Sequence, residues 1–378
     1  MKVLSLFSGI GAFEKALTNL GIEYDLAGYC EIDKYASRSF AAIHSISEEK
    51  NLGDITKINT EEIPTNIDLL TYGFPCQDIS VAGKQKGFTD QAGETTRSGL
   101  FFEALRIIEK TKPKIAIAEN VKNLISQKFK NEFDIVLDSL DKAGYNNYWQ
   151  VLNAKDYSVP QNRERVFIVS VRKDIDWAPG LFSFPEPEPL TKRLIDVLET
   201  QVDAKFYITK YDNIRKVNDN YFMLEGGTIG KMHDISRRVY NPDYIAPTIH
   251  CCGGGNLEPK ILEPTAAAIR GRYLETGQSV QQLEISNRTL SNAVTTVQKD
   301  SLVFNPEERR VRKLTPKECF RLMGFSDADF EKAQSCNSNT QLYKQAGNSI
   351  VVPVLEKLFN KILNVFDIES DKGDDWMN

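Results

Sequence analysis

The sequence has few of the residues from which metal sites are built, and it has no long apolar stretch. It contains three histidines and six cysteines, and no two cysteines form a Cys-x-x-Cys pair, so a structural zinc site is not expected. No run of about 18 apolar residues is present, which excludes a membrane-spanning helix on the usual length argument. This cysteine usage fits a reducing, cytoplasmic setting.

The sequence also lacks an excess of basic residues. Its net charge of −5 argues at first against a nucleic-acid partner, but the charge is unevenly distributed. Residues 367–378 carry five acidic residues and one lysine, whereas residues 190–315 carry 18 basic and 15 acidic residues. The middle of the chain is therefore weakly basic. A hydrophobic fraction of 41% over 378 residues predicts a substantial core and two domains.

Residues 1–175 alternate short apolar runs with helical patterns, which predicts an α/β fold with a mostly parallel sheet and helices on both faces. The expected strands are 2–7, 25–31, 67–72, 115–119 and 166–171, and the expected helices are 12–20, 100–110 and 132–143. Prolines at 185–189 indicate an extended linker before a region of short β-like runs. A helix start is expected at Thr315 and Pro316, and a last amphipathic helix at about 352–366 should pack on the first domain.

The segment Phe7–Gly11, FSGIG, lies between the first expected strand and the first expected helix. Glycines at such a turn let a ligand approach the backbone. A third glycine would complete a dinucleotide fingerprint, but Glu14 holds that position and would repel a pyrophosphate. Glu31 is placed to accept ribose hydroxyls, and Asp54 to bind an adenine amino group. The set favours an adenosine ligand without phosphates, although a plain strand–turn–helix would fit too.

Two reactive side chains follow apolar runs. Cys76 comes after the run 67–72 and Pro75, just past an expected strand end, where ligand crevices open in α/β sheets. Glu119 ends the run that begins at Ile115, and partial desolvation there would raise its pKa. Each also fits an ordinary role, as an inert core cysteine and as a solvated glutamate near a helix N-cap.

The segment Gln161–Arg165, QNRER, leads directly into the expected strand 166–171. If the extended conformation begins here, Arg163 and Arg165 point to one face. Two guanidinium groups on one face would bind an anionic or carbonyl-rich group, or would pair with surface acids. All of these motifs are expected at strand ends of one sheet.

The motifs FSGIG, GFPCQ, ENV and QNRER, then KLTPKECFRLMGF and YKQAGNS, occur in this order in DNA (cytosine-5) methyltransferases. The chain resembles the small bacterial or phage members of that family over nearly its whole length, apart from about residues 190–305. The resemblance implies a Rossmann-like S-adenosylmethionine-dependent methyltransferase sheet and a smaller β-rich target-recognition domain. We expect a catalytic domain of residues 1–185, completed by 340–378, and a recognition domain of residues 186–339.

The resemblance also implies a catalytic role for each matching residue. Cys76 would attack carbon 6 of a cytosine flipped out of the duplex. Glu119 would hold the ring at nitrogen 3 and supply a proton there. Arg165 would contact the base carbonyl and position Glu119, and Arg163 would be a supporting or phosphate-side contact.

The same resemblance implies S-adenosyl-L-methionine as the methyl donor. Many family members have tryptophan where this chain has Ile32, so apolar contact with adenine is kept and aromatic stacking is lost. The expected cofactor contacts are Phe7, Gly9, Ile10, Glu31, Ile32, Asp54, Ile55, Pro75, Leu100, Asn348 and Ser349.

Double-stranded DNA is the expected partner. Residues 80–98 resemble the mobile family loop that closes over DNA, and the expected contacts there are Ser80, Lys84, Gln85, Lys86 and Arg97. The candidates for reading base edges are His233, Arg237, Arg238, Thr248 and His250. We expect a monomer without a membrane partner or bound metal, and a cognate restriction endonuclease is a candidate functional partner that acts on the same site without direct contact.

Three other functions would use parts of the same pattern. Methylation of transfer RNA by the same chemistry is disfavoured by the long recognition segment. A non-catalytic DNA-binding regulator is disfavoured because Cys76, Glu119 and Arg165 are all present. An NAD-dependent dehydrogenase is disfavoured by Glu14 at the third glycine position.

Overall fold

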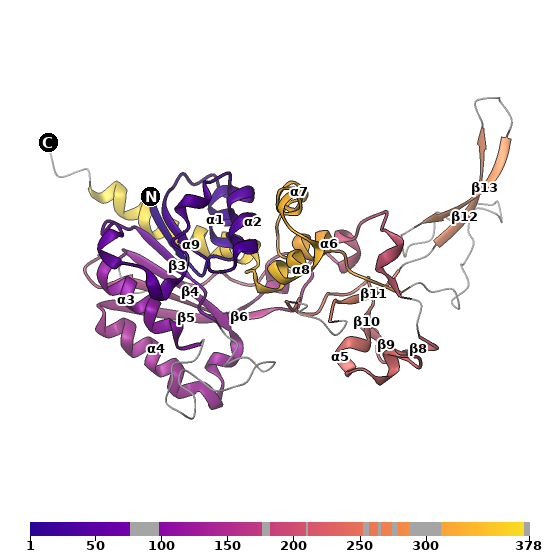
Figure 1. The fold of residues 1–378 in the computed structure, drawn as a ribbon, viewed down its shortest axis with the longest axis horizontal. Coiled ribbons are helices and arrows are strands. Elements are labelled where there is room, and N and C mark those ends of the chain that lie inside the picture. Colours follow the sequence, from indigo (N-terminus) through magenta and orange to yellow (C-terminus); the bar gives the residue numbers. More distant parts are fainter. Residues whose placement is uncertain are drawn as a thin grey trace.

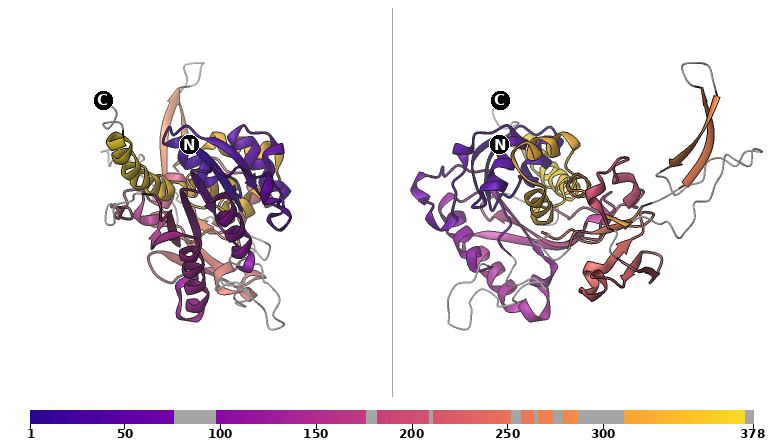
Figure 2. Two further views of the ribbon diagram at one scale, coloured as in Figure 1. Left: turned by 90° about the vertical axis from the view of Figure 1, so that its left-hand side faces the viewer. Right: turned by 45° about the vertical axis from the view of Figure 1, so that its right-hand side comes forward.

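The computed structural model describes residues 1–75, 98–175, 182–208, 211–251, 257–263, 266–273, 279–286 and 311–373. The chain forms a large α/β domain, a smaller sheet domain and a two-stranded hairpin that projects away from both (Figures 1 and 2). The strands of the large domain are β1 (Lys2–Leu6), β2 (Asp25–Cys30), β3 (Leu69–Tyr72), β4 (Ile115–Val121), β5 (Tyr145–Asn153) and β6 (Glu164–Arg172).

The main sheet has the strand order β2-β1-β3-β4-β6-β5. β1 pairs in parallel with β2 and β3, and β3 pairs in parallel with β4. β6 is antiparallel to both of its neighbours, β4 and β5. The predicted parallel arrangement therefore holds for the first four strands and changes at β6. Because β6 runs against β4, its first residues lie at the edge of the sheet where β1 to β4 end.

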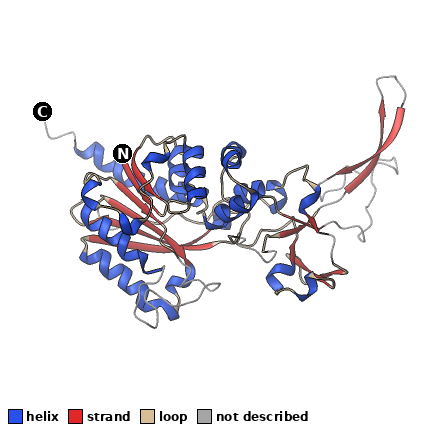
Figure 3. Cartoon of the chain, in the orientation of Figure 1, coloured by secondary structure: helices blue, strands red, loops and turns tan. Residues whose placement is uncertain are grey.

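Helices cover both faces of this sheet, as the sequence pattern predicts (Figure 3). The helices on one face are α1 (Ala12–Asn19), α2 (Lys34–His44) and α9 (Val352–Gly373), and those on the other are α3 (Phe101–Thr111) and α4 (Lys130–Lys142). Successive strand residues enter opposite cores, Val3 on the α1 side and Leu4 on the α3 side. The final helix packs on α1 as predicted, with the ring centroids of Phe13 and Phe359 6.2 Å apart.

The smaller domain is built on a second six-stranded sheet, which confirms the predicted β-rich domain. Its order is β7-β14-β11-β10-β9-β8, and among its described pairings β10 and β11 are parallel and the others antiparallel. The projecting hairpin is formed by β12 and β13, which pair with each other. The elements are β7 (Tyr207–Ile208), β8 (Asn213–Lys216), β9 (Tyr221–Glu225), α5 (Asp234–Arg237), β10 (Arg238–Tyr240), β11 (Lys260–Leu262), β12 (Ala266–Tyr273), β13 (Ser279–Ser286) and β14 (Val311–Lys313).

Three helices, α6 (Pro316–Leu322), α7 (Asp327–Cys336) and α8 (Asn339–Asn348), lie between the two sheets (Figure 1). α6 begins where the sequence predicts a start. The Thr315 hydroxyl accepts a hydrogen bond from the Glu318 amide, and the Glu318 carboxylate accepts one from the Thr315 amide at 2.7 Å. This reciprocal cap satisfies two of the free amides at the helix start.

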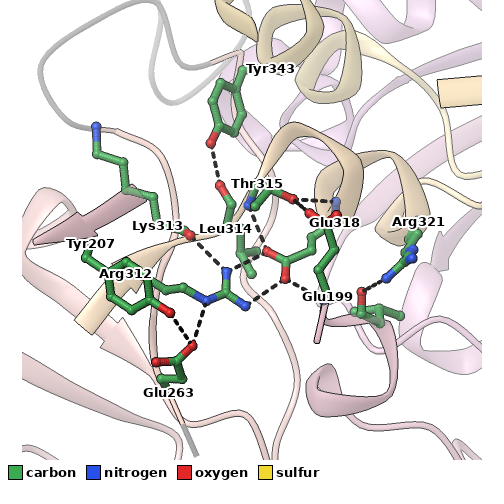
Figure 4. A network of polar contacts seen from close by, with 11 residues as sticks. Glu199, Tyr207, Glu263, Arg312, Lys313, Leu314, Thr315, Glu318, Arg321 and Tyr343 are labelled. Carbon is green, nitrogen blue, oxygen red and sulfur yellow. Dashed lines mark hydrogen bonds and ion pairs between the residues drawn. The ribbon is translucent and has the colours of Figure 1, made fainter. Parts of the chain in front are cut away.

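Glu318 is also the centre of a buried ion-pair network at the base of the small sheet (Figure 4). Its carboxylate accepts hydrogen bonds from both terminal nitrogens of Arg312, at 2.7 and 2.8 Å. The amides of Thr315 and Glu199 complete four bonds to the same carboxylate. On its other side the Nε of Arg312 lies 3.6 Å from Glu263. The network therefore fixes β14 of the small sheet to α6, which packs in the core of the large domain.

Candidate functional site

The glycine turn, residues 7–11, stands at the carboxyl end of β1, between the ends of β2 and β3. At Gly11 φ is +80°, and a Cβ atom there would lie 2.2 Å from Nε2 of His44. Burial lowers the pKa of His44 to about 4, so the ring is neutral near pH 7. Its Nε2–H therefore donates to the Ile10 carbonyl, at 3.1 Å. Sequence patterns gave no sign of this support, because His44 is distant in sequence from the turn.

Glu31 follows β2, and its carboxylate lies beside the turn. The amides of Gly9 and Asp33 donate to its two oxygens, at 2.9 and 2.7 Å. Burial raises the pKa of Glu31, and these amide bonds oppose the rise. The Asn51 side chain accepts from the Glu31 amide at 3.0 Å and donates to its carbonyl at 2.9 Å. Asn51 thus holds the predicted ribose carboxylate in place, although no local sequence pattern marks it.

The predicted adenine contacts differ in exposure. Ile32, beside Glu31, is 74% exposed and offers an apolar surface to a ligand. Asp54 caps the turn that follows it, and its bonds to the hydroxyl and amide of Thr56 lower its pKa. Ile55 is buried in the core.

A pocket joins the glycine turn to the end of β4. It brings together five of the predicted site residues, Phe7, Gly9, Glu119, Asn348 and Ser349. Ile10 is buried beneath the turn, and Pro75 and Leu100 are half-buried outside the pocket lining. The full lining is Leu6, Phe7, Ser8, Gly9, Ala12, Phe13, Gly73, Glu119, Asn348, Ser349 and Ile350.

Glu119 and Arg165 form an ion pair in this site. Arg165 Nε lies 2.9 Å from Oε1 of Glu119, and the two side chains are 16% and 13% exposed. They meet because Arg165, at the start of β6, pairs with Val121, two residues beyond Glu119 on β4. Burial raises the pKa of Glu119, and the charges of Arg165 and Arg163 oppose the rise. The site thus contains a carboxyl group that holds its proton to a higher pH than an exposed glutamate.

The segment Gly73–Pro75 passes directly beside Glu119. A Cβ atom at Gly73 would lie 3.7 Å from Oε2 of Glu119, and Asn120 donates to the Phe74 carbonyl at 3.0 Å. The end of β4 therefore holds the segment that precedes Cys76. The predicted site residues outside the described parts of the chain are Cys76, Ser80, Lys84, Gln85, Lys86 and Arg97.

The predicted DNA-reading residues of the second domain fall into two groups. His233, Arg237 and Arg238 lie in or beside α5, where Arg237 is in an ion pair and Arg238 lies over a tyrosine ring. Thr248 and His250 lie apart from them. Thr248 donates to the Asn162 carbonyl at 2.6 Å, beside the QNRER segment, and the His250 backbone lies against Gly347. Within the described residues no group of His, Cys, Asp and Glu side chains is arranged to hold a metal, and no helix is long and apolar enough to cross a bilayer.

The profile of the C-5 cytosine-specific DNA methylase family matches residues 1–364. The orphan methyltransferase M.SPBetaI of Bacillus phage SPbeta is 35% identical over 97% of this chain and 98% of its own length. The type II methyltransferase M.HhaI of Haemophilus parahaemolyticus is 32% identical over 94% and 92%. Among solved structures, the S. pombe Dnmt2 methyltransferase shares the fold, with a TM-score of 0.63 and 19% identity over 97% of this chain and 99% of that one.

Proposed function

Because the chain belongs to the C-5 cytosine-specific DNA methylase family, it methylates carbon 5 of cytosine in DNA with S-adenosylmethionine, and we propose which of its residues perform the steps. The family match over residues 1–364 confirms the resemblance that the order of the sequence motifs indicated. One observation supports the proposal: Glu119, which is paired with Arg165, lines the same pocket as the glycine turn and Ser349.

Cys76 is the nucleophile. Its thiolate adds to carbon 6 of the cytosine, and the electrons of the 5,6 double bond move into the ring toward nitrogen 3. Glu119 gives its proton to nitrogen 3, which the raised pKa of this carboxyl supports. Arg165 holds Glu119 in place and contacts the base carbonyl. The ring is reachable because the target base leaves the duplex.

The second half of the reaction restores the ring. When bound, S-adenosylmethionine would supply the methyl group that carbon 5 receives, and S-adenosylhomocysteine would be the leaving group. The proton on carbon 5 then leaves to a base, the 5,6 double bond forms again, and the bond from Cys76 to carbon 6 breaks. The proton on nitrogen 3 returns to Glu119, so the enzyme ends in its starting state.

The described residues fit an adenosine-based methyl donor. Glu31, held by the Gly9 and Asp33 amides, is placed to accept the ribose hydroxyls. A Cβ at Gly9 would meet no atom within 4 Å, so the turn leaves room for a ligand, and Ile32 offers an exposed apolar surface. The other proposed contacts are Phe7, Ile10, Asp54, Ile55, Pro75, Leu100, Asn348 and Ser349.

We place target reading in the second domain, residues 186–339, and closure over DNA in the segment that follows Cys76. Among the described candidates, His233, Arg237 and Arg238 lie together near α5, and Thr248 contacts Asn162 in the QNRER segment. The chain acts as a monomer in this proposal, and a cognate endonuclease would share only the DNA site.

A trapping experiment tests the nucleophile. Fluorine at carbon 5 cannot leave as the proton does, so duplex DNA with 5-fluorocytosine should stay bonded to Cys76 after methyl transfer. We expect a denaturant-resistant complex with the wild type and with Cys251→Ala, an exposed cysteine that serves as control, and none with Cys76→Ala. A complex that persists in Cys76→Ala would contradict the assignment.

Bisulfite sequencing of DNA from a methylation-free bacterial host that expresses the chain would identify the target sequence. We expect methylcytosine in one short sequence context. Parallel assays with tritiated S-adenosylmethionine on duplex DNA and transfer RNA should label the DNA alone. Label on transfer RNA and none on duplex DNA would contradict the proposal.

A further inference from the structure

Arg163 is a buried charged residue that lies where the two domains meet. The residue is 3% exposed, and its guanidinium donates to backbone carbonyls. Nη1 donates to Ile249 at 2.9 Å, and Nη2 donates to Gly347 at 3.0 Å and to Ser349 at 2.7 Å. Charge-assisted hydrogen bonds are stronger than neutral ones, and three of them hold the two terminal nitrogens of this buried guanidinium. The side chain is therefore a fixed part of the structure.

The three carbonyls belong to two segments that are far apart in the sequence, one at Ile249 and the other at Gly347 and Ser349. Ile249 lies in the second half of the chain, Gly347 is in the last turn of α8, and Ser349 lines the pocket with Glu119. The end of a helix presents partial negative charge, which favours a cation at Gly347. The segments are in close contact, because a Cβ atom at Gly347 would lie 2.3 Å from the carbonyl carbon of His250.

Hydrogen bonds beside Arg163 reinforce this joint. The Asn162 amide donates to the Ala246 carbonyl at 2.9 Å, and the Thr248 hydroxyl donates to the Asn162 carbonyl at 2.6 Å. The buried side-chain oxygen of Gln161 accepts from the Ile249 amide at 3.3 Å. Residues 246–249 are thus tied to the start of β6 at several points.

We propose that Arg163 is a positioning residue that sets the Ser349 wall of the cofactor pocket against the recognition segment at Ile249. This inference rests on the proposed function, in which that pocket holds S-adenosylmethionine and the second domain reads DNA. A movement of Ile249 on target binding would reach Ser349 through one rigid group. Cofactor affinity therefore depends on the same guanidinium that holds the recognition segment.

The charge of Arg163 gives a second, separate effect. Burial raises the pKa of Glu119, and the charges of Arg165 and Arg163 oppose the rise. Removal of the Arg163 charge should therefore raise the pKa of Glu119 further. Since Glu119 acts as an acid in the proposed reaction, the loss of activity at high pH would move to still higher pH.

The test compares three variants of the full chain. Arg163→Gln removes the charge, and Gly347→Ala strains the same joint but keeps the charge. Arg172→Gln, at the far end of the strand β6 that follows Arg163, is the control, and Arg172 is paired with Asp174. The affinity for S-adenosylhomocysteine is measured by calorimetry without DNA, beside the melting temperature. We expect about tenfold weaker binding in the first two variants and no change in the control. In Arg163→Gln the cause is the loss of charge-assisted bonds, and in Gly347→Ala it is the clash with the His250 backbone.

The pH profile of methyl transfer separates positioning from general stability. We expect a shift to higher pH in Arg163→Gln and none in Gly347→Ala. Wild-type affinity in both variants, or a loss confined to the melting temperature, would overturn the inference. If Arg163→Gln does not fold, Arg163→Lys, which keeps the charge, should weaken cofactor binding without the pH shift, and wild-type affinity there would overturn the inference. A wild-type chain that binds S-adenosylhomocysteine but methylates no DNA would instead overturn the proposed function.

Discussion

Glu14 is a fully buried carboxyl group that takes no part in the proposed chemistry. It lies in the first turn of α1, and within the described residues neither of its oxygens has a hydrogen-bond partner. Burial raises the pKa of this carboxyl group, and the nearby Ser5 hydroxyl opposes the rise without a hydrogen bond to either carboxyl oxygen. Burial dominates and raises the pKa of Glu14 to about 7. Folding therefore favours the protonated form of this group.

The size of the effect follows from that pKa. A rise from 4.5 to about 7 corresponds to about 3 kcal/mol, at roughly 1.4 kcal/mol for each pKa unit. The folded state binds the proton of Glu14 more tightly than the unfolded state does. This contribution to the free energy of unfolding is therefore fully present below pH 4.5 and is lost as the pH rises to about 7. Above that range the free energy of unfolding stays lower by the full amount.

The variant Glu14→Gln removes this titration and keeps the size of the side chain. The difference in free energy of unfolding, variant minus wild type, should increase by about 3 kcal/mol between pH 4.5 and pH 8. For 378 residues this corresponds to a relative rise of roughly 4 °C in melting temperature, followed by circular dichroism. Glu23→Gln, an exposed glutamate in the loop after α1, is the control. A difference between variant and wild type that does not change with pH would refute the reasoning.

Three further substitutions test the site and the joint. Glu119→Ala should slow single-turnover methyl transfer about 100-fold or more while DNA binding persists, and a near-normal rate would remove Glu119 from the acid role. Glu318→Gln should lower the free energy of unfolding in urea by about 3 kcal/mol, because Arg312 would keep a buried charge without a charged partner at Glu318. The control is Glu331→Gln, at an exposed glutamate that pairs with Lys317, and its free energy of unfolding should stay within about 0.5 kcal/mol of the wild type. Equal losses of stability in the two variants would contradict the role of the network. Gly11→Ala should weaken S-adenosylhomocysteine binding about tenfold in calorimetry, because the residue has a positive φ and its new Cβ atom would clash with His44. Gly21→Ala, at φ +71° with open space around it, should leave the affinity unchanged. Equal affinities of the two variants would show that the clash is relieved without movement of the turn.

Local patterns predicted the elements that are buried on both faces or capped by nearby residues. Strands β1, β2, β3, β4 and β6 appear as apolar runs, and α6 begins at the capping box formed by Thr315 and Glu318. The supports of the site could not be predicted in this way. His44 and Asn51 act on residues 20 or more positions away, and their contacts exist only after the sheet has formed. The roles of Arg163 and Arg165 differ for the same reason, since one contacts carbonyls and the other contacts Glu119.

The strand that sequence analysis missed also explains how the QNRER segment reaches the site. In a fully parallel sheet the start of a strand lies opposite the ligand edge, so a catalytic motif that precedes a strand would be misplaced. β5 shows little apolar pattern, because it is an edge strand with exposed residues. Yet only residues 154–163 separate β5 from β6, and parallel strands need a crossover of a dozen residues or more. A strand assigned at 145–153 would therefore have required antiparallel pairing of β5 with β6. In the structure β6 also runs against β4, and this direction places Arg165 beside the end of β4.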